Sequence, residues 1–429
     1  MEHLIFQCVL LEVRKFSEKG KSFWHCKSET RLLHFNCDNA KKYAGEKEEN
    51  VKRYIKAAAV AAALSVLLTS CGIRQTEYER EDTVTLTVAV RAGETGLIQK
   101  IQPGFEAENP SVKLKITELS AGFEQYSLYA SAFSSGEYLF DLVETEDVWI
   151  DDFIRKGWID VLPESLNPGK GYFGYVYDSF ARGDAYWAVP FQMDLGMLFS
   201  LDEYGWDGEY SSMADKSAGN AGALKIEDDR EDIICALMEL IEYCDGDVQT
   251  ALELYGSIYK YAGSERVKLN EFKKGNVPVM HSWSSIIPSL YDDSSKVVAT
   301  FRAHNTPLSP EGNETTVAKL FGFAVSSLSE HKPECEKFLE YISRDSVQTQ
   351  LIEQSGMYPM KPDMYEDLTI VSTWKHIPAM SSRMENVSIR PHTENYAASA
   401  LDVREAVYAY LEGTAGAEEA AAKIQGFLN

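Results

Sequence analysis

This 429-residue sequence lacks the marks of several common activities. It has no phosphate-binding GxxxxGK loop and no HExxH motif, and its eight histidines are scattered rather than paired at ligand spacing. After residue 70 the chain holds only 30 basic residues against 58 acidic ones, so it lacks the basic surface that nucleic acids require. The sequence therefore predicts no ATP hydrolysis, no metal site, no cofactor and no nucleic-acid partner.

Cysteine is also scarce in the body of the chain. Only Cys235, Cys244 and Cys335 lie deep in it, and three thiols cannot all pair with one another, so disulfides are not its stabilising device. Hydrophobic residues make up 45% of the chain and aromatic residues 11%, which is enough for a large interior. A chain of 429 residues exceeds one ordinary core, so we expect two lobes or domains.

No long apolar run is present, but a short one follows a basic cluster near the start. Lys52, Arg53 and Lys56 precede the twelve apolar residues 57–68, which are too few to cross a bilayer comfortably. This profile is typical of an export signal, which we assign to residues 51–70.

The end of this segment, Leu68-Thr69-Ser70-Cys71, resembles the lipobox of bacterial lipoproteins. The resemblance implies lipidation of Cys71 and stable anchoring to the cell membrane, with a polar tether over residues 71–82. The alternative is a short signal anchor with an unmodified Cys71. Because an export signal should be N-terminal and a GTG codon can encode valine or a bacterial start, we expect translation to begin at Val51. Residues 1–50 would then form no part of the native fold.

Regular spacing of apolar residues predicts an α/β fold in the exported part. Residues 83–90, 112–116 and 140–143 have the composition of strands, and the helical segments 97–105 and 124–133 separate them. Sequential strands separated by helices imply a largely parallel sheet. Apolar stripes predict further helices around 233–241, after Pro333 and before Gly413, and residues 211–223 read as a surface loop.

A series of short segments, in this order, is similar to the family of ABC-importer extracellular solute-binding proteins that includes maltose- and trehalose-type receptors. The segments are residues 105–110 (FEAENP), 141–149 (DLVETEDVW), 186–199 (YWAVPFQMDLGMLF), 279–283 (VMHSW) and Arg390-Pro391. The resemblance extends from about residue 83 to the C-terminus. It implies a two-lobed periplasmic-binding-protein-like (type II) clamshell with hinge crossings, which we expect to be monomeric. Lobe 1 would comprise 83–192 plus 303–345, and lobe 2 would comprise 193–302 plus 346–429.

A sugar offers an apolar face on which aromatic rings stack and a rim of hydroxyls that carboxylates, amides and arginine bind. The candidate platforms are Trp149, Trp187, Trp283 and Tyr358, and the candidate rim partners are Glu94, Gln125, Glu146, Asp194 and Arg390. Trp187 lies in a strand-like run, so packing in the interior is its alternative. The resemblance supports the acid and aromatic at Glu146 and Trp149, and the acidic ligand at Asp194. Each has a structural alternative: Trp149 could be core, Glu94 and Gln125 solvated loop residues, and Arg390 a salt bridge.

The expected function is capture of a sugar or oligosaccharide by hinge closure and delivery to an ABC permease, outside the cytoplasm and without covalent chemistry. One rival is an exported carbohydrate-active hydrolase, since Glu144, Glu146 and Asp147 supply clustered carboxylates, although hydrolysis needs two acids at a set separation. A second rival keeps the fold but binds a polyamine, a quaternary amine or an iron chelate, because an aromatic cage with acids also holds a cation.

Overall fold

The computed structural model describes side chains at residues 83–167, 171–206, 208–210, 231–258, 269–393 and 395–428. The backbone alone is described at 13–18, 21–28, 31–36, 224–226, 230, 260–261 and 265–268. The predicted export signal at 51–70, Cys71, the predicted tether up to residue 82 and the predicted loop at 211–223 lie outside the described residues. Residues 1–80 and 81–429 form two compact units.

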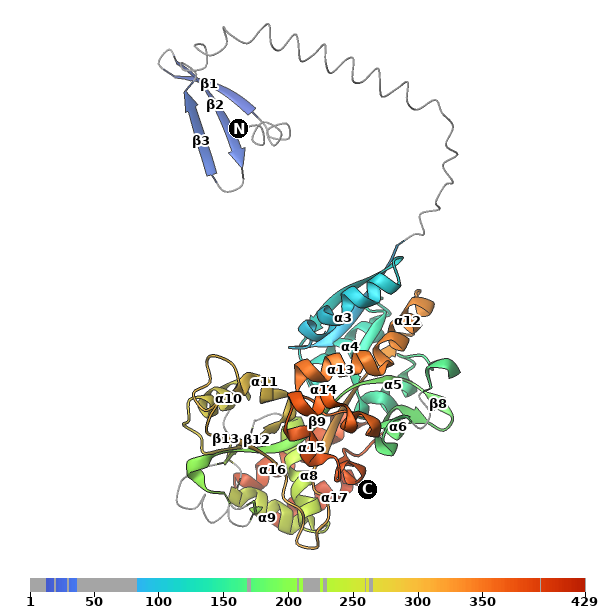
Figure 1. The fold of residues 1–429 in the computed structure, drawn as a ribbon, viewed down its shortest axis with the longest axis vertical. Coiled ribbons are helices and arrows are strands. Elements are labelled where there is room, and N and C mark those ends of the chain that lie inside the picture. The colour runs from blue at the N-terminus through green and yellow to red at the C-terminus, as the bar shows by residue number, and fades with distance from the viewer. Residues whose placement is uncertain are drawn as a thin grey trace. The chain divides into compact units, whose positions relative to one another are not determined.

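The first unit contains an antiparallel meander of three strands (Figure 1). β1 (Val13–Glu18) pairs with β2 (Lys21–Ser28), which pairs in turn with β3 (Arg31–Asn36). Two statements stay predictions from the sequence: that residues 1–50 form no part of the native fold, and that translation starts at Val51.

One mixed sheet organises the second unit. Ten strands of its described residues join in the order β11-β10-β12-β9-β14-β6-β4-β5, with β13 beside β9 and β15 beside β14. Their bounds are β4 (Val84–Arg91), β5 (Val112–Leu119), β6 (Leu142–Glu146), β9 (Val189–Leu201), β10 (Leu224–Ile226), β11 (Lys260–Tyr261), β12 (Val279–Trp283), β13 (Phe301–Asn305), β14 (Val317–Val325) and β15 (Ser388–Ile389). β7 (Ala181–Arg182) and β8 (Ala185–Tyr186) form a separate small hairpin.

The predicted parallel β-α-β units are confirmed at the start of this unit. β4 runs parallel to β5 and to β6, and the connections are α3 (Thr95–Glu108) and α4 (Phe123–Ser135). The buried face of α3 carries Ile98, Ile101 and Phe105, whose spacing of three and four residues places them on one side of the helix. Parallel strands bring their carboxyl ends to the same edge of the sheet, where ligands usually bind.

The long strand β9 connects the two halves of the sheet. All thirteen of its residues are buried. Its first half, up to Leu195, pairs with β14, whereas Gly196 and the residues after it pair with β12 or β13. A single continuous strand therefore passes from the half that contains β4, β5 and β6 into the half that contains β10, β11 and β12.

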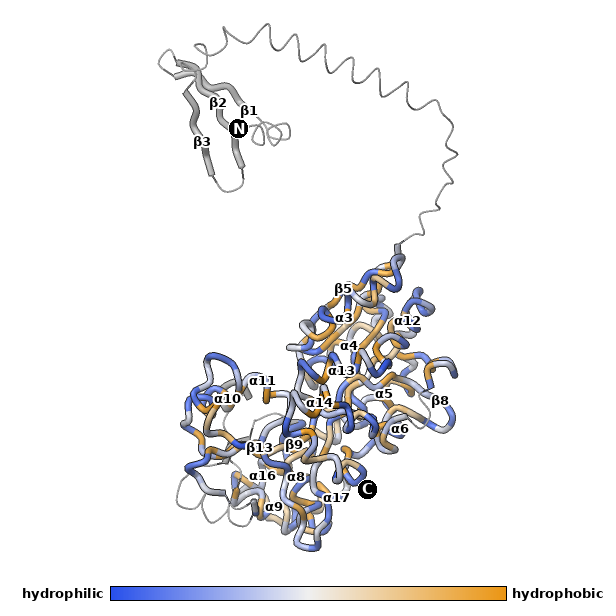
Figure 2. The backbone as a smooth tube through the Cα atoms, in the orientation of Figure 1, coloured by the Kyte–Doolittle hydropathy of each residue, from blue (hydrophilic) through white to orange (hydrophobic). Residues whose placement is uncertain are grey.

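Helices cover the sheet, and Figure 2 shows hydrophobic and hydrophilic residues alternating along them, as amphipathic helices require. Four helices pack against one another: α8 (Arg230–Tyr243), α9 (Val248–Ile258), α16 (Tyr396–Leu411) and α17 (Ala417–Leu428). The other half contains α12 (Lys332–Ser343) and α13 (Asp345–Ser355) (Figure 1). The predicted helices correspond to α8, α12 and α16, with Pro333 in the first turn of α12 and Gly413 after α16 at a φ of 73°. No helix within the described residues has both the length and the apolar character needed to cross a membrane. The remaining helix bounds are α5 (Ile150–Lys156), α6 (Gly174–Phe180), α10 (Glu265–Lys273), α11 (Ile287–Leu290), α14 (Leu368–Thr373) and α15 (His376–Met380).

Candidate functional site

A cavity of about 300 Å³ lies where strand ends meet the starts of α4 and α8. Three of the predicted site residues line it: Glu146 at the end of β6, Asp194 in the middle of β9 and Trp283 at the end of β12. The other lining residues are Arg91, Ala121, Gly122, Glu231, Asp232, Ser285, Lys319 and Phe321. Strands from both halves of the sheet therefore contribute to one polar cavity.

Asp194 is buried in the wall of this cavity and held in a fixed orientation. Its Oδ1 accepts hydrogen bonds from the Ser284 hydroxyl at 2.5 Å and from the Ser285 backbone N–H at 3.0 Å. Burial raises the pKa of the Asp194 carboxyl above its usual value, while these two bonds and the nearby Lys319 charge partly offset the rise. The carboxylate is an oriented acceptor at the point where β9 crosses between the halves.

The indole of Trp283 is fixed by a carboxylate and covered by a cation. Its Nε1 donates to Asp232 Oδ1 at 2.5 Å, and the same oxygen accepts from Lys319 Nζ at 2.9 Å. Lys319 Nζ lies 3.7 Å from the centroid of the Trp283 ring, a cation–π contact. The ring is thus an oriented platform whose face contacts an ammonium group.

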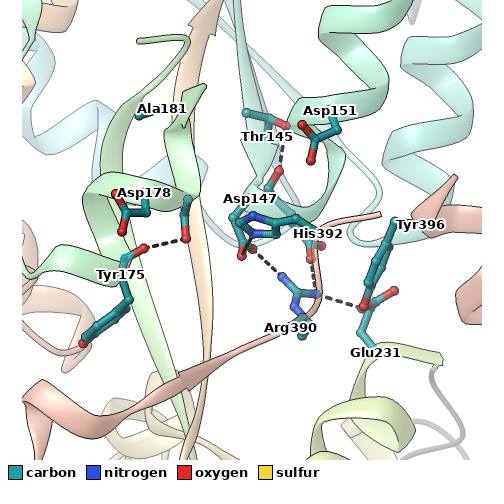
Figure 3. Close-up of polar contacts among 12 residues, drawn as sticks. Thr145, Asp147, Asp151, Tyr175, Asp178, Ala181, Glu231, Arg390, His392 and Tyr396 are labelled. Atoms are coloured by element: carbon teal, nitrogen blue, oxygen red, sulfur yellow. Dashed lines mark hydrogen bonds and ion pairs between the residues drawn. The ribbon is translucent and has the colours of Figure 1, made fainter. Parts of the chain in front are cut away.

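Arg390 is fully buried and binds two of the carboxylates that line the cavity, and Figure 3 shows its contacts with Asp147 and Glu231. Its Nη1 donates to Glu146 Oε2 at 2.6 Å and to Glu231 Oε2 at 2.8 Å, and its Nη2 donates to Asp147 Oδ1 at 2.8 Å. Tyr396 donates to Glu231 at 2.7 Å. Burial opposes ionisation of Asp147, but the Arg390 charge and the His392 ring, whose Nε2 lies 3.1 Å from Asp147 Oδ2, together lower its pKa. Arg390 therefore positions residues of the lining and is itself outside it.

Arg91 forms the other polar wall of the cavity. Its Nη2 donates to Glu94 Oε1 at 3.0 Å and to Gln192 Oε1 at 2.8 Å, and its guanidinium carbon lies 3.6 Å from the centroid of the Phe321 ring. Glu144 also pairs with Arg91. Among the described residues, Glu94 Oε2 and Gln192 Nε2 are buried and have no hydrogen-bond partner. Neither residue is part of the cavity lining, so this unused bonding capacity lies behind Arg91.

Five predicted residues are buried outside the cavity lining: Glu94 and Arg390, whose contacts are given above, and Gln125, Trp149 and Tyr358. Gln125 donates to the Tyr129 hydroxyl at 3.0 Å and to the Glu144 carbonyl at 3.3 Å. Trp149 packs on the ring of Tyr126 with centroids 5.7 Å apart. Tyr358 lies under β9, where its N–H donates to the Met193 carbonyl at 3.1 Å.

Several lining residues escaped prediction although the sequence carried weak signals for them. Lys319 and Phe321 are two apart on β14, so they share one face of that strand. Asp232 belongs to the acidic first turn of α8. Arg91 is the last residue of β4, at the edge where parallel strands end. Polar residues at the ends of strands and the starts of helices were therefore the sequence signal that could have identified these lining residues.

The lining of the cavity can offer a ligand hydrogen bonds and charges. It contains four carboxylates and two cations. Within the described residues, no cluster of three or more histidine, cysteine, aspartate or glutamate side chains could hold a metal ion. The described cysteines, Cys235, Cys244 and Cys335, are free thiols.

A family model for bacterial extracellular solute-binding proteins matches residues 105–379. The fold is also similar to that of solved two-lobed binding proteins. Maltose-bound MalE3 of T. maritima is 17% identical with a TM-score of 0.72, and the match covers 80% of this chain and 99% of that one.

Two further structures share the fold. The GacH receptor of Streptomyces glaucescens, studied unliganded and with acarbose, is 20% identical with a TM-score of 0.69, over 80% of this chain and 96% of that one. UgpB of Mycobacterium tuberculosis, in complex with glycerophosphocholine, is 13% identical with a TM-score of 0.67, over 79% of this chain and 96% of that one. The expected α/β two-lobed clamshell is confirmed by these similarities.

Proposed function

The chain belongs to the family of bacterial extracellular solute-binding proteins, and on that premise we propose that it binds a sugar or oligosaccharide between its lobes and delivers it to an ABC importer. The observation that carries this proposal is the pairing of an oriented indole, Trp283, with an oriented carboxylate, Asp194, in one cavity. An aromatic face stacks on the C–H face of a pyranose, and a carboxylate accepts from its hydroxyls.

The wall around Arg91 supports the same ligand class. Glu94 Oε2 and Gln192 Nε2 are an acceptor and a donor, and a sugar hydroxyl that reaches behind Arg91 can serve both kinds of atom. Of the predicted ligands, we keep Glu146, Asp194 and Trp283 as direct contacts, and Glu94 as a contact at the edge of the site. Arg390 acts through Glu146 and Glu231, and the packing of Gln125, Trp149 and Tyr358 favours supporting roles.

Hinge closure is the proposed mechanism. The ligand contacts come from both halves of the sheet, which β9 joins, so they are satisfied together only when the lobes close. The sugar thereby shifts the equilibrium toward the closed form, whose shape a permease recognises. We place the lobe boundaries at 83–192 plus 303–345 and at 193–302 plus 346–429, in a monomeric protein.

Membrane anchoring is a further part of the proposal and rests on the sequence alone. Membership of the family indicates a location outside the cytoplasm. The segment that resembles a lipobox ends at Cys71, so acylation there would hold the protein at the cell membrane through a short tether. Mass spectrometry of the protein extracted from membranes would detect the acyl chains on Cys71, and a Cys71→Ser variant released into the medium would support anchoring.

A cationic ligand is the second candidate, and the contact between Lys319 and Trp283 favours it. The ammonium of Lys319 lies over the indole and donates to Asp232, which is how a protein also holds an amine ligand. A polyamine or quaternary amine would then compete with Lys319 for this position.

A thermal-shift and calorimetry panel of sugars and amines separates these candidates. We expect saturable binding of a sugar with a rise in the melting temperature of the protein. We expect no product after long incubation with oligosaccharides, because binding and delivery of a sugar require no catalytic pair. Trp283→Ala should weaken binding by tenfold or more, whereas Trp206→Ala, which removes an indole outside the cavity lining, should leave affinity unchanged. Binding of amines alone would favour the second candidate, and turnover of a glycoside would overturn both.

A further inference from the structure

Three of the four carboxylates that line the candidate cavity are neutralised within the chain. Glu146 and Glu231 share the guanidinium of Arg390, with N–O distances of 2.6 and 2.8 Å. Asp232 pairs with the ammonium of Lys319 at 2.9 Å. A carboxylate that is removed from water is stable only when it is paired, and for these three the protein itself supplies the cation.

Asp194 is the fourth carboxylate, and it forms no ion pair with a described residue. Its hydrogen bonds come from uncharged groups of Ser284 and Ser285, and only 5% of the residue is exposed. The ammonium of Lys319 is bound to Asp232, so it acts on Asp194 through its longer-range charge. Burial outweighs these effects and raises the pKa of the Asp194 carboxyl. A cation brought by a ligand would stabilise the ionised form of this side chain.

The two cations of the lining favour a ligand that also has acceptor atoms. Lys319 Nζ lies 3.7 Å from the centroid of the Trp283 ring, and the guanidinium carbon of Arg91 lies 3.6 Å from the centroid of the Phe321 ring. A ligand with several positive charges would be repelled at these two positions, whereas hydroxyl oxygens accept hydrogen bonds from ammonium and guanidinium groups. The cavity therefore suits a molecule that combines one ammonium group with several hydroxyls.

We propose that the ligand is an amino sugar, whose ammonium group pairs with Asp194 and whose hydroxyls bind the other polar groups of the lining. The proposal rests on the proposed function and narrows its ligand class to saccharides with a protonated amine. A neutral sugar leaves Asp194 without a counterion, and a polyamine brings several positive charges and no hydroxyl. An amino sugar satisfies both the carboxylate and the two cations.

The test compares saccharides that differ in one substituent. Calorimetry would measure binding of glucose, glucosamine and N-acetylglucosamine, which carry a hydroxyl, an ammonium and an uncharged amide at the same ring carbon. Cellobiose and the glucosamine dimer of the same linkage repeat the comparison with a longer ligand. Spermidine, which has ammonium groups and no hydroxyl, represents the polyamines.

Two variants identify the group that recognises the amine. Asp194→Asn keeps the shape of the side chain and removes its charge. Asp292→Asn is the matched control, because Asp292 pairs with Lys273 outside the cavity lining and its side chain is 45% exposed.

We expect the wild-type protein to bind glucosamine or its dimer at least about tenfold more tightly than the neutral counterparts, in keeping with one charge-assisted hydrogen bond. Asp194→Asn should reduce this ratio to about one, because it removes the charge that the ammonium group recognises. Asp292→Asn should leave the ratio unchanged, and spermidine should bind more weakly than the amino sugars.

Failure of the amino-sugar proposal is distinguishable from failure of the proposed function. If a neutral saccharide binds as tightly as its amine counterpart, or if the preference for the amine survives in Asp194→Asn, the amino-sugar proposal is overturned and the proposed function stands. If spermidine binds and no saccharide does, or if none of these molecules binds, both proposals fail.

Discussion

Replacing Arg390 by methionine is the sharpest test of the charge cluster behind the site. The guanidinium pairs with Glu146, Asp147 and Glu231, and none of its side chain is exposed. Methionine fills a similar volume but leaves three carboxylates without their common cation. Removal of one partner from a buried ion pair typically costs about 3–5 kcal/mol, so we expect the free energy of unfolding to fall by at least about 3 kcal/mol.

The size of this loss should depend on pH. In the wild-type protein Arg390 lowers the pKa of Asp147 despite burial, so the stabilisation from this pair is complete above the unfolded pKa of about 4 and is lost as the pH falls through the lowered folded value. In the variant His392 still lies beside Asp147, with Nε2 3.1 Å from Oδ2, but the loss of the Arg390 charge leaves burial less opposed and the pKa of Asp147 higher than in the wild-type protein. The deficit of Arg390→Met should therefore be larger near pH 8 than near pH 5.

Urea unfolding followed by circular dichroism at both pH values would measure the deficit. Arg344→Met is the matched control, because Arg344 pairs with Glu108 at 2.7 Å but its side chain is 42% exposed. Exposed ion pairs contribute about 0–1 kcal/mol, so this control should lose less than about 1 kcal/mol at either pH. Equal losses in both variants, or an Arg390→Met deficit that does not change with pH, would refute the reasoning.

Two other predictions concern β9. Burial raises the pKa of Asp194, so as the pH is lowered sugar affinity should begin to fall at a higher pH than it would with an exposed aspartate, because the carboxylate is protonated earlier. Asp194→Asn should weaken binding about tenfold or more and flatten that profile in calorimetry, and an unchanged profile would exclude Asp194 as a ligand. Gly196→Ala would place a Cβ 1.8 Å from Glu239 Oε1, so it should cost about 1–3 kcal/mol in urea unfolding. Gly96→Ala, whose Cβ would meet nothing within 4 Å in α3, should stabilise by about 0.5–1 kcal/mol, and similar effects of the two changes would contradict this account.

The family and the secondary structure could be predicted from the sequence because both depend on the order of residues that are near one another in the chain. Alternating apolar residues marked β4, three- and four-residue spacing marked α3, and Pro333 and Gly413 marked helix ends. The order of short segments from residue 105 onward was enough to indicate a solute-binding protein, and the family match to residues 105–379 agrees.

Only some residues of the candidate site could be predicted from the sequence. Asp194 and Trp283 were predicted because they stand at fixed places in family segments, and both line the cavity. Trp149 and Tyr358 have the right chemistry, but helix and strand packing buries their rings away from the lining. An aromatic residue at a strand end reads the same in sequence whether its ring faces a cavity or the core.

By itself, the sequence determined the helices and strands, the fold class and two of the strongest candidate ligand-binding residues, Asp194 and Trp283. Only the tertiary structure decided that Arg390 joins Glu146 and Glu231, and that Lys319 lies over Trp283. The physical reason is that these contacts join residues far apart in the chain, through the pairing of β9 with β14 and β12, whereas periodicity reports only on near neighbours.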